Sequence, residues 1–199
     1  MRRFVLTGAP GAGKTTLIRH FEELGRFVVE EAATDIIRIS QANGVKEPWA
    51  DPSFIEDILE LQSERQMSAL KQETELQFFD RGPLDTLALC RFLEHPISPG
   101  LLTKILRVQE AGRFENEVFF LDNLGFCEPS SARKISFEEA CRFETVHKEV
   151  YSEFGYRFCN VPPLSVPLRA MFILERVQET SLQTPSSAFR EKYLSLSCV

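Results

Sequence analysis

A glycine-rich run has the residue types and the spacing to hold a phosphate. The run is Gly8-Ala9-Pro10-Gly11-Ala12-Gly13-Lys14-Thr15, which fits the pattern G-x-x-x-x-G-K-[ST]. Its glycines let the backbone curl until several N–H groups point at one anion. Lys14 can reach the β- and γ-phosphates of a nucleoside triphosphate, and the hydroxyl of Thr15 is placed to hold Mg²⁺. A turn that binds nothing is the alternative, but such a turn has no need of Lys and Thr at a helix start.

The segments on either side of this run have the patterns of a buried strand and a helix. Residues 3–7 are apolar and β-branched, as in a buried parallel strand, and residues 16–24 carry their apolar side chains on one helical face. A strand, a loop and a helix in this order put the phosphate at a helix N-terminus, where the helix dipole favours anions. We expect the contacts to the triphosphate to come from Gly8, Gly11, Ala12, Gly13, Lys14, Thr15 and Thr16.

Asp80 and Arg81 follow a second apolar strand candidate, residues 76–80. An acid at the end of a buried strand is what a magnesium site beside a P-loop needs. The same carboxylate could instead act as general base toward an acceptor hydroxyl, or only cap the next helix. Arg81 would bind phosphate or steady the acid through paired hydrogen bonds.

Glu30 and Glu31 end another strand candidate, residues 26–31. Side chains alternate along a strand, so only one of the two glutamates faces the cleft. We take Glu31 as the group that accepts a proton from a substrate hydroxyl, with Glu30 as the alternative. Two solvated strand-end acids are the other interpretation.

Three further residues are weaker candidates. Asp122 ends the strand candidate 117–122, and Asp122-Asn123-Leu124-Gly125 superficially matches the D-x-x-G of GTPases, but no guanine motif follows it. Arg133 lies in a polar loop, where it could close over the transferring phosphoryl group or be an ordinary surface cation. Trp49 lies between two prolines and either lines a substrate pocket or covers the core.

Strand and helix patterns alternate along the chain. Strands are expected at residues 3–7, 26–31, 76–80, 117–122 and 156–161, and helices at 16–24, 32–40, 53–73, 84–93, 101–112, 136–154 and 165–177. This alternation predicts an α/β fold: a three-layer P-loop NTPase sandwich with a five-stranded parallel sheet and helices on both faces. The polar strand ends then meet at one rim. We expect one domain over residues 1–178 and a Ser- and Thr-rich tail over 179–199.

Composition excludes several other classes of protein. The chain has 199 residues, of which 43% are hydrophobic, and this suits a single core. Its net charge of −6 provides no basic face for duplex nucleic acid. The five cysteines form no C-x-x-C pair and the three histidines have no zinc spacing, which indicates reduced thiols and a cytoplasmic protein. No apolar stretch is long enough for a membrane span.

The motifs resemble those of a family of small ATP-binding proteins, the AAA-domain ATPases, and are similar to those of P-loop nucleoside-type kinases, including the ribosylnicotinamide kinase group. The resemblance spans roughly residues 2–178 and is carried by residues 2–17, 29–33, 48–52, 79–82, 137–140 and 155–156. It implies ATP and Mg²⁺ as cofactors, Lys14 and Thr15 as their ligands, and Asp80 as the strand-three acid. Glu31 resembles the acid that contacts an acceptor in nucleoside kinases.

Two positions depart from the pattern of similar sequences. Thr34 stands where they usually have an arginine, and Ser130, Ser131 and Ala132 precede Arg133 where they have an acid. Our leading hypothesis is a Mg-ATP-dependent kinase of a nucleoside- or nucleotide-like small molecule that is itself unidentified. The alternative is a regulatory NTPase or switch without such an acceptor. In the kinase, Lys14, Glu31, Asp80, Arg81 and Arg133 would carry the chemistry.

Overall fold

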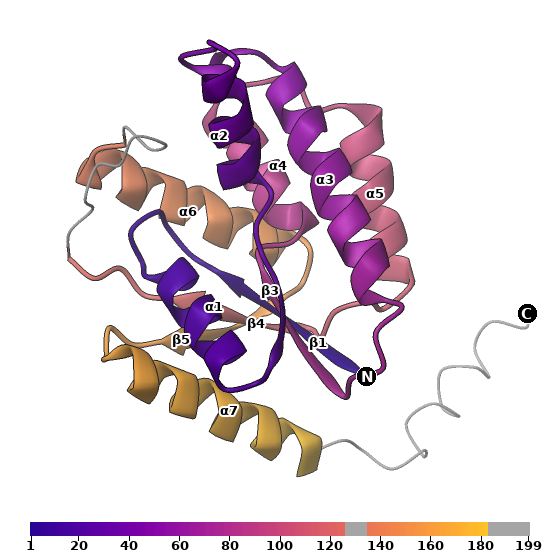
Figure 1. The fold of residues 1–199 in the computed structure, drawn as a ribbon, viewed down its shortest axis with the longest axis vertical. Coiled ribbons are helices and arrows are strands. Elements are labelled where there is room, and N and C mark those ends of the chain that lie inside the picture. Colours follow the sequence, from indigo (N-terminus) through magenta and orange to yellow (C-terminus); the bar gives the residue numbers. More distant parts are fainter. Residues whose placement is uncertain (126–134, 183–199) are drawn as a thin grey trace, which may run out of the picture.

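Five strands of the described residues form one parallel sheet in the order β2-β3-β1-β4-β5 (Figure 1). The computed structural model describes residues 1–125 and 135–182. The strands are β1 (Arg2–Thr7), β2 (Phe27–Val29), β3 (Leu76–Asp80), β4 (Glu117–Leu121) and β5 (Arg157–Val161). The helices are α1 (Lys14–Glu23), α2 (Ala33–Ala42), α3 (Ser53–Ala69), α4 (Pro83–Phe92), α5 (Pro99–Glu110), α6 (Phe137–Glu153) and α7 (Val166–Leu182), with a 3₁₀ turn η1 (Pro48–Ala50) before α3. The predicted α/β alternation is confirmed.

The sheet order places β1 in the centre, between β3 and β4. The chain runs from β1 to β2 and β3 on one side and then crosses to β4 on the other, so the strand order reverses at β1. Leu6 of β1 pairs with Asp80 of β3 and with Phe119 of β4. Ligands of open α/β sheets bind at the carboxyl ends of the strands, beside such a reversal.

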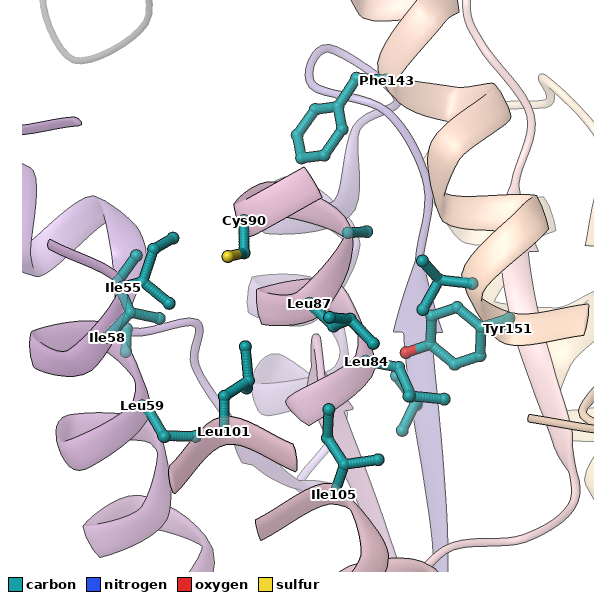
Figure 2. Close-up of a cluster of buried hydrophobic side chains, with 14 of the residues drawn as sticks. Ile55, Ile58, Leu59, Leu84, Leu87, Cys90, Leu101, Ile105, Phe143 and Tyr151 are labelled. Atoms are coloured by element: carbon teal, nitrogen blue, oxygen red, sulfur yellow. The ribbon is translucent and has the colours of Figure 1, made fainter. Parts of the chain in front are cut away.

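Alternation along the strands builds a separate core on each face of the sheet. Val5 and Val118 face a cluster with helices α2 to α6. Phe4 and Leu6 face a cluster with α1 and α7, and Phe119 points the same way. Figure 1 shows α1 and α7 side by side on their face, and Figure 2 shows the other cluster, where Tyr151 reaches from α6 toward α4. The predicted three-layer sandwich is therefore the observed architecture.

Most elements begin or end a few residues away from the predicted ranges, and two of these differences have a physical reason in the contacts. Strand β2 ends at Val29, before the glutamates, because Arg65 of α3 donates to the carbonyl oxygens of Glu30 and Glu31, at 3.2 and 2.6 Å. Helix α7 continues to Leu182, and Arg2 ties its last turns to β1 by donating to the carbonyl of Val177 at 2.8 Å. Within the described residues, no helix is both long and apolar enough to cross a membrane.

Candidate active site

The glycine-rich run forms the loop between β1 and α1, at the carboxyl end of the central strand. Gly8 has φ +133°, and a Cβ there would lie 2.6 Å from the carbonyl oxygen of Leu121 on β4, so the tight approach of loop and strand requires glycine. Helix α1 begins directly after Gly13, which has φ +81° and provides no capping side chain. The first N–H groups of the helix thus lack a side-chain cap, an arrangement suited to an anion.

Lys14 is buried and folds back over the loop. Its Nζ donates to the carbonyl oxygens of Gly8 and Ala9, at 2.7 and 2.8 Å. Thr15 and Thr16 follow in the first turn of α1 with exposed side chains. All seven residues expected to contact the triphosphate therefore lie in this loop or in the first turn of α1.

Arg169 of α7 supports the loop from a distant part of the chain, and no sequence pattern predicted this role. Its side chain is 2% exposed, and Nη1 donates to the carbonyl oxygen of Ala12 at 2.7 Å. A Cβ on Gly13 would lie 3.2 Å from the same nitrogen. Desolvation lowers the pKa of Arg169, and the charge of Asp122 opposes that shift. Nε and Nη2 have no hydrogen-bond partner in the part of the chain that the structure describes.

Asp80 is the last residue of β3 and is 3% exposed. Its register partner is Leu6, two residues before the loop, so its carboxylate and the loop share one edge of the sheet. Asp80 and Thr15 both offer oxygen donors of the kind Mg²⁺ prefers. Over residues 1–125 and 135–182, no group of three or more His, Cys, Asp and Glu side chains could hold a metal ion. These two side chains suit a Mg²⁺ ion that takes most of its ligands from phosphates and water.

Glu31 and Glu30 point in different directions. Glu31 is 7% exposed, whereas Glu30 is exposed. One oxygen of the Glu31 carboxylate accepts from Arg81 Nε at 2.7 Å, and the other accepts from the hydroxyl of Thr34. The residue that departs from the family pattern thus bonds directly to the glutamate, and Glu31 is the one that faces inward.

Arg81 is the centre of a buried polar network. It lies in the turn between β3 and α4 with φ +72°, a conformation that costs energy for a residue other than glycine. Nη1 lies 3.1 Å from Asp85 Oδ1 and 2.9 Å from His147 Nε2. Desolvation alone would lower the pKa of Arg81, but the negative charges of Glu31 and Asp85 hold it above its ordinary value. The guanidinium therefore stays charged.

Asp85 anchors this network, and sequence reasoning missed it. Oδ1 accepts from the hydroxyl of Thr7 at 2.5 Å, and Oδ2 accepts from the backbone N–H of Gly82 at 2.8 Å and from the hydroxyl of Tyr151 at 2.5 Å. Desolvation acts to raise the pKa of Asp85, yet the contact with His147 and the charge of Arg81 bring it well below the ordinary value. The available signal was an acid at the third position of a helix that starts with Pro83.

A cavity of about 250 Å³ adjoins the loop at Pro10. Its polar lining includes Glu31, Arg81 and Gln62. Its apolar lining includes Ile37, Trp49, Phe54, Ile58, Phe92 and Phe143. Trp49 lines this pocket and also packs against the core cluster on that face of the sheet, so the two interpretations of this residue do not exclude each other.

Gln62 of α3 is a second lining residue that the sequence did not reveal. It is 4% exposed, and its Oε1 accepts from the backbone N–H of Ala32 at 3.0 Å. Its Nε2 has no hydrogen-bond partner among residues 1–125 and 135–182. A buried amide donor on a cavity wall is placed to bond an acceptor atom of a ligand.

Asp122 and Arg133 stand apart from this arrangement. Asp122 follows β4 and is half-buried, and desolvation raises its pKa, with Lys148 lowering it and Glu144 raising it further. It is not among the residues that line the cavity. Arg133 lies within residues 126–134, outside the described residues.

Comparisons with known proteins agree with this fold. A family model for the AAA domain matches residues 3–169. A deoxyadenosine kinase from M. mycoides with its products dCMP and dCDP superposes with a TM-score of 0.57 at 14% identity, covering 89% of this chain and 99% of that one. The same kinase with bound dATP gives 0.55 at 17% identity, covering 89% and 100%. A search of curated protein sequences finds no match.

The family match spans most of the chain, and the two superpositions cover nearly the whole of the solved proteins. The resemblance found from the motifs is therefore confirmed. The chain belongs to the AAA domain family, and its fold is the P-loop fold of the deoxyadenosine kinases.

Proposed function

We propose that this protein is a Mg-ATP-dependent kinase that phosphorylates a small molecule of nucleoside or nucleotide type. The family and the fold indicate a P-loop kinase or ATPase. The observation that carries the kinase proposal is the cavity beside the loop, which is lined by Glu31 and Arg81 and walled by aromatic rings. An ATPase that only hydrolyses its nucleotide has no need of such a second pocket.

On the donor side, Lys14 and the N–H groups of the loop would stabilise charge on the β- and γ-phosphates. Thr15 and Asp80 would hold Mg²⁺, which when bound neutralises charge on the phosphates. Lys14 already has its ammonium group over the loop, at 2.7 Å from the carbonyl of Gly8. Phosphate oxygens would take the place of these carbonyls as its acceptors.

On the acceptor side, Glu31 would take the proton from the hydroxyl that attacks the γ-phosphate. Arg81 would hold the acceptor or the transferring group through Nη2, because its Nε is engaged by Glu31 and its Nη1 by Asp85 and His147. Glu31 and Arg81 are largely buried and line the same cavity as Pro10 of the loop, which supports transfer between two ligands that are shielded from water.

The walls of the cavity favour a flat, partly polar acceptor. Trp49, Phe54, Phe92 and Phe143 offer aromatic surface against which a ring can pack. Gln62 adds one directed donor, which suits a ring nitrogen or carbonyl oxygen. The volume of about 250 Å³ is close to the lower end of ligand pockets, roughly 300–1,000 Å³, as a nucleoside-sized ligand requires. The M. mycoides kinases, described with nucleotides bound, support the same class.

We also propose that the protein is cytoplasmic, and its thiols support this. Cys90, Cys141 and Cys159 are free in the described residues. Reduced thiols are usual in the cytoplasm, so we place the protein there.

The test is to incubate the protein with Mg-ATP and a panel of nucleosides, nucleoside monophosphates and ribosylnicotinamide while measuring ADP. We expect one class of acceptor to raise ADP release well above the rate without acceptor, with a phosphorylated product visible by mass spectrometry. Slow hydrolysis at one rate across the whole panel would overturn the kinase and favour a nucleotide-dependent switch. Lys14→Ala serves as the control, because it removes the phosphate contact common to both functions.

A further inference from the structure

His147 of α6 is fully buried beside Arg81, and the proposed function does not use it. Its Nδ1 lies 2.8 Å from the carbonyl oxygen of Phe143, one turn earlier in the same helix. A carbonyl oxygen only accepts hydrogen bonds, so Nδ1 carries a hydrogen and donates it. In the neutral ring, Nε2 then has a lone pair and acts as an acceptor.

The other side of the ring faces two groups of opposite character. Arg81 Nη1 lies 2.9 Å from His147 Nε2, and Asp85 Oδ1 lies 3.3 Å from it. The neutral ring can accept from the arginine. A second proton would set an N–H against the N–H of Arg81, so that bond would be lost. Desolvation lowers the pKa of His147, Asp85 raises it and Arg81 lowers it, and the net shift is downward, which favours the neutral ring.

The other hydrogen bonds of Asp85 and Arg81 indicate which of the two residues His147 can hold in place. Asp85 already accepts from Thr7, Gly82 and Tyr151, so its carboxylate is fixed without the imidazole. Arg81 is different, because not all three nitrogen atoms of its guanidinium are bonded. Nε is bonded to Glu31 and Nη1 to Asp85 and His147, while Nη2 has no hydrogen-bond partner in the described part of the chain.

We propose that His147 is a positioning residue: its neutral imidazole accepts a hydrogen bond from Arg81 and so directs the unbonded edge of the guanidinium into the cavity. This inference rests on the proposed function, in which that edge meets the acceptor or the transferring phosphoryl group. Glu31, in the segment after β2, and His147, in α6, both hold the guanidinium, so its plane is fixed from two sides. The left-handed backbone of Arg81 makes this support more important, since the turn itself does not favour the conformation.

The hydrogen bond between Arg81 and His147 is tested by nitrogen NMR on protein with ¹⁵N-labelled histidine. This experiment requires no phosphoryl acceptor. The resonances of His147 are assigned by their loss in His147→Gln. We expect a neutral ring with hydrogen on Nδ1 that does not titrate between pH 6 and 8. A ring with hydrogen on Nε2, or one that becomes charged in this range, would overturn the proposal.

The role of His147 in phosphoryl transfer is tested by steady-state kinetics with Mg-ATP and deoxyadenosine, or with the best acceptor of the panel if that is different. His147→Phe keeps a ring and removes the acceptor atom, and we expect kcat to fall about 10- to 100-fold with the KM for ATP near the wild-type value. His147→Gln can still accept through its amide oxygen, and we expect it to recover most of the rate. Tyr151→Phe is the matched control, because it loses a buried hydrogen bond to Asp85 and does not touch Arg81.

The outcomes separate the two proposals. Equal rates for His147→Phe and the wild type, or a fall in Tyr151→Phe as large as that in His147→Phe, would refute a positioning role. If His147→Phe does not fold, a rate of His147→Gln below that of Tyr151→Phe would refute it as well. If the wild type phosphorylates no acceptor, the proposed function fails, and the NMR result still decides whether His147 holds Arg81.

Discussion

Arg81 and Glu31 form an ion pair between the ends of β3 and β2, with Nε 2.7 Å from Oε2 and both side chains nearly buried. The two residues are 50 positions apart in the chain, so the pair exists only when the two strands lie side by side in the sheet. It brings a fixed positive charge and a proton acceptor to the same wall of the cavity.

Replacing Glu31 by Gln tests the proton acceptor. The amide keeps the size of the side chain but cannot take a proton from a hydroxyl, so we expect kcat to fall by about 100- to 10,000-fold in the acceptor-dependent assay. Glu30→Gln is the control, because that neighbouring side chain is exposed, and it should keep the wild-type rate. Similar rates for the two variants would assign the base elsewhere, with Asp80 the next candidate.

Lys14 is expected to be required for nucleotide binding. With Mg-ATP at about 100 times Kd, ligand binding adds about 2.7 kcal/mol of stability, which raises the Tm of a chain this long by roughly 5–10 °C. Lys14→Ala should lose this rise, because the contact to two phosphates is gone. The exposed Lys46→Ala should keep it. Equal Tm rises in both variants would contradict the assignment of the phosphate loop.

Gln62 is expected to contribute to the choice of acceptor. Gln62→Glu keeps the oxygen that accepts from Ala32 and removes the amide donor, so kcat/KM for a nucleoside acceptor should drop by roughly 10- to 100-fold. Gln66→Glu is the matched control, since Gln66 is buried one turn further along α3, also has an Nε2 with no partner among the described residues, and does not line the cavity. Parallel losses in the two variants would point to a shared effect on folding.

Arg169 is expected to support nucleotide binding through the loop. Arg169→Met removes the bond to the Ala12 carbonyl, a hydrogen bond from a charged group worth about 1.5–3 kcal/mol, so Kd for Mg-ATP should rise by roughly 10- to 100-fold in calorimetric titration. Arg176→Met, on the same helix, breaks an ion pair with Glu117 that does not touch the loop. It should leave Kd unchanged, and an equal loss there would show that α7 acts only by packing.

Asp85 is expected to make stability depend on pH. Its pKa in the folded protein is below the ordinary value of about 3.9, so its contribution is present above that value and is lost as the pH falls toward the folded pKa. Urea titrations should show the free energy of unfolding decreasing below about pH 5. Asp85→Asn should be less stable at pH 7 by roughly 3–5 kcal/mol and should show a flatter decline. Curves of equal slope would exclude Asp85 as the cause.

Much of the candidate site could be predicted from local sequence patterns. The spacing from Gly8 to Thr15 and the acid at the end of the strand that closes with Asp80 are contiguous features, so they could be predicted without the fold. The α/β alternation was also readable, because buried parallel strands are short apolar runs. The inward direction of Glu31 was left open, since β2 ends before it and strict alternation no longer applies.

The supporting residues could not be predicted, because their roles depend on contacts between distant segments. His147 meets Arg81 across 66 positions and Gln62 meets Ala32 across 30, and within its own helix each looks like an ordinary polar residue. Hydrophobic periodicity indicates which face of a helix is buried but does not identify the residues that contact this face. Asp85 had a local signal in its helix start, yet its five neighbours come from β1, α6 and the turn before α4.

The hydrogen bond between Arg169 and Ala12 has a consequence during synthesis of the chain, because it joins residues 157 positions apart. The loop is therefore synthesised well before the arginine that braces it. A nascent chain that ends before α7 therefore has the complete G-x-x-x-x-G-K-[ST] motif without the contact that holds it in shape. Binding of nucleotide would then be weaker until synthesis has passed Arg169, so the ligand favours a chain that includes this residue over a shorter one.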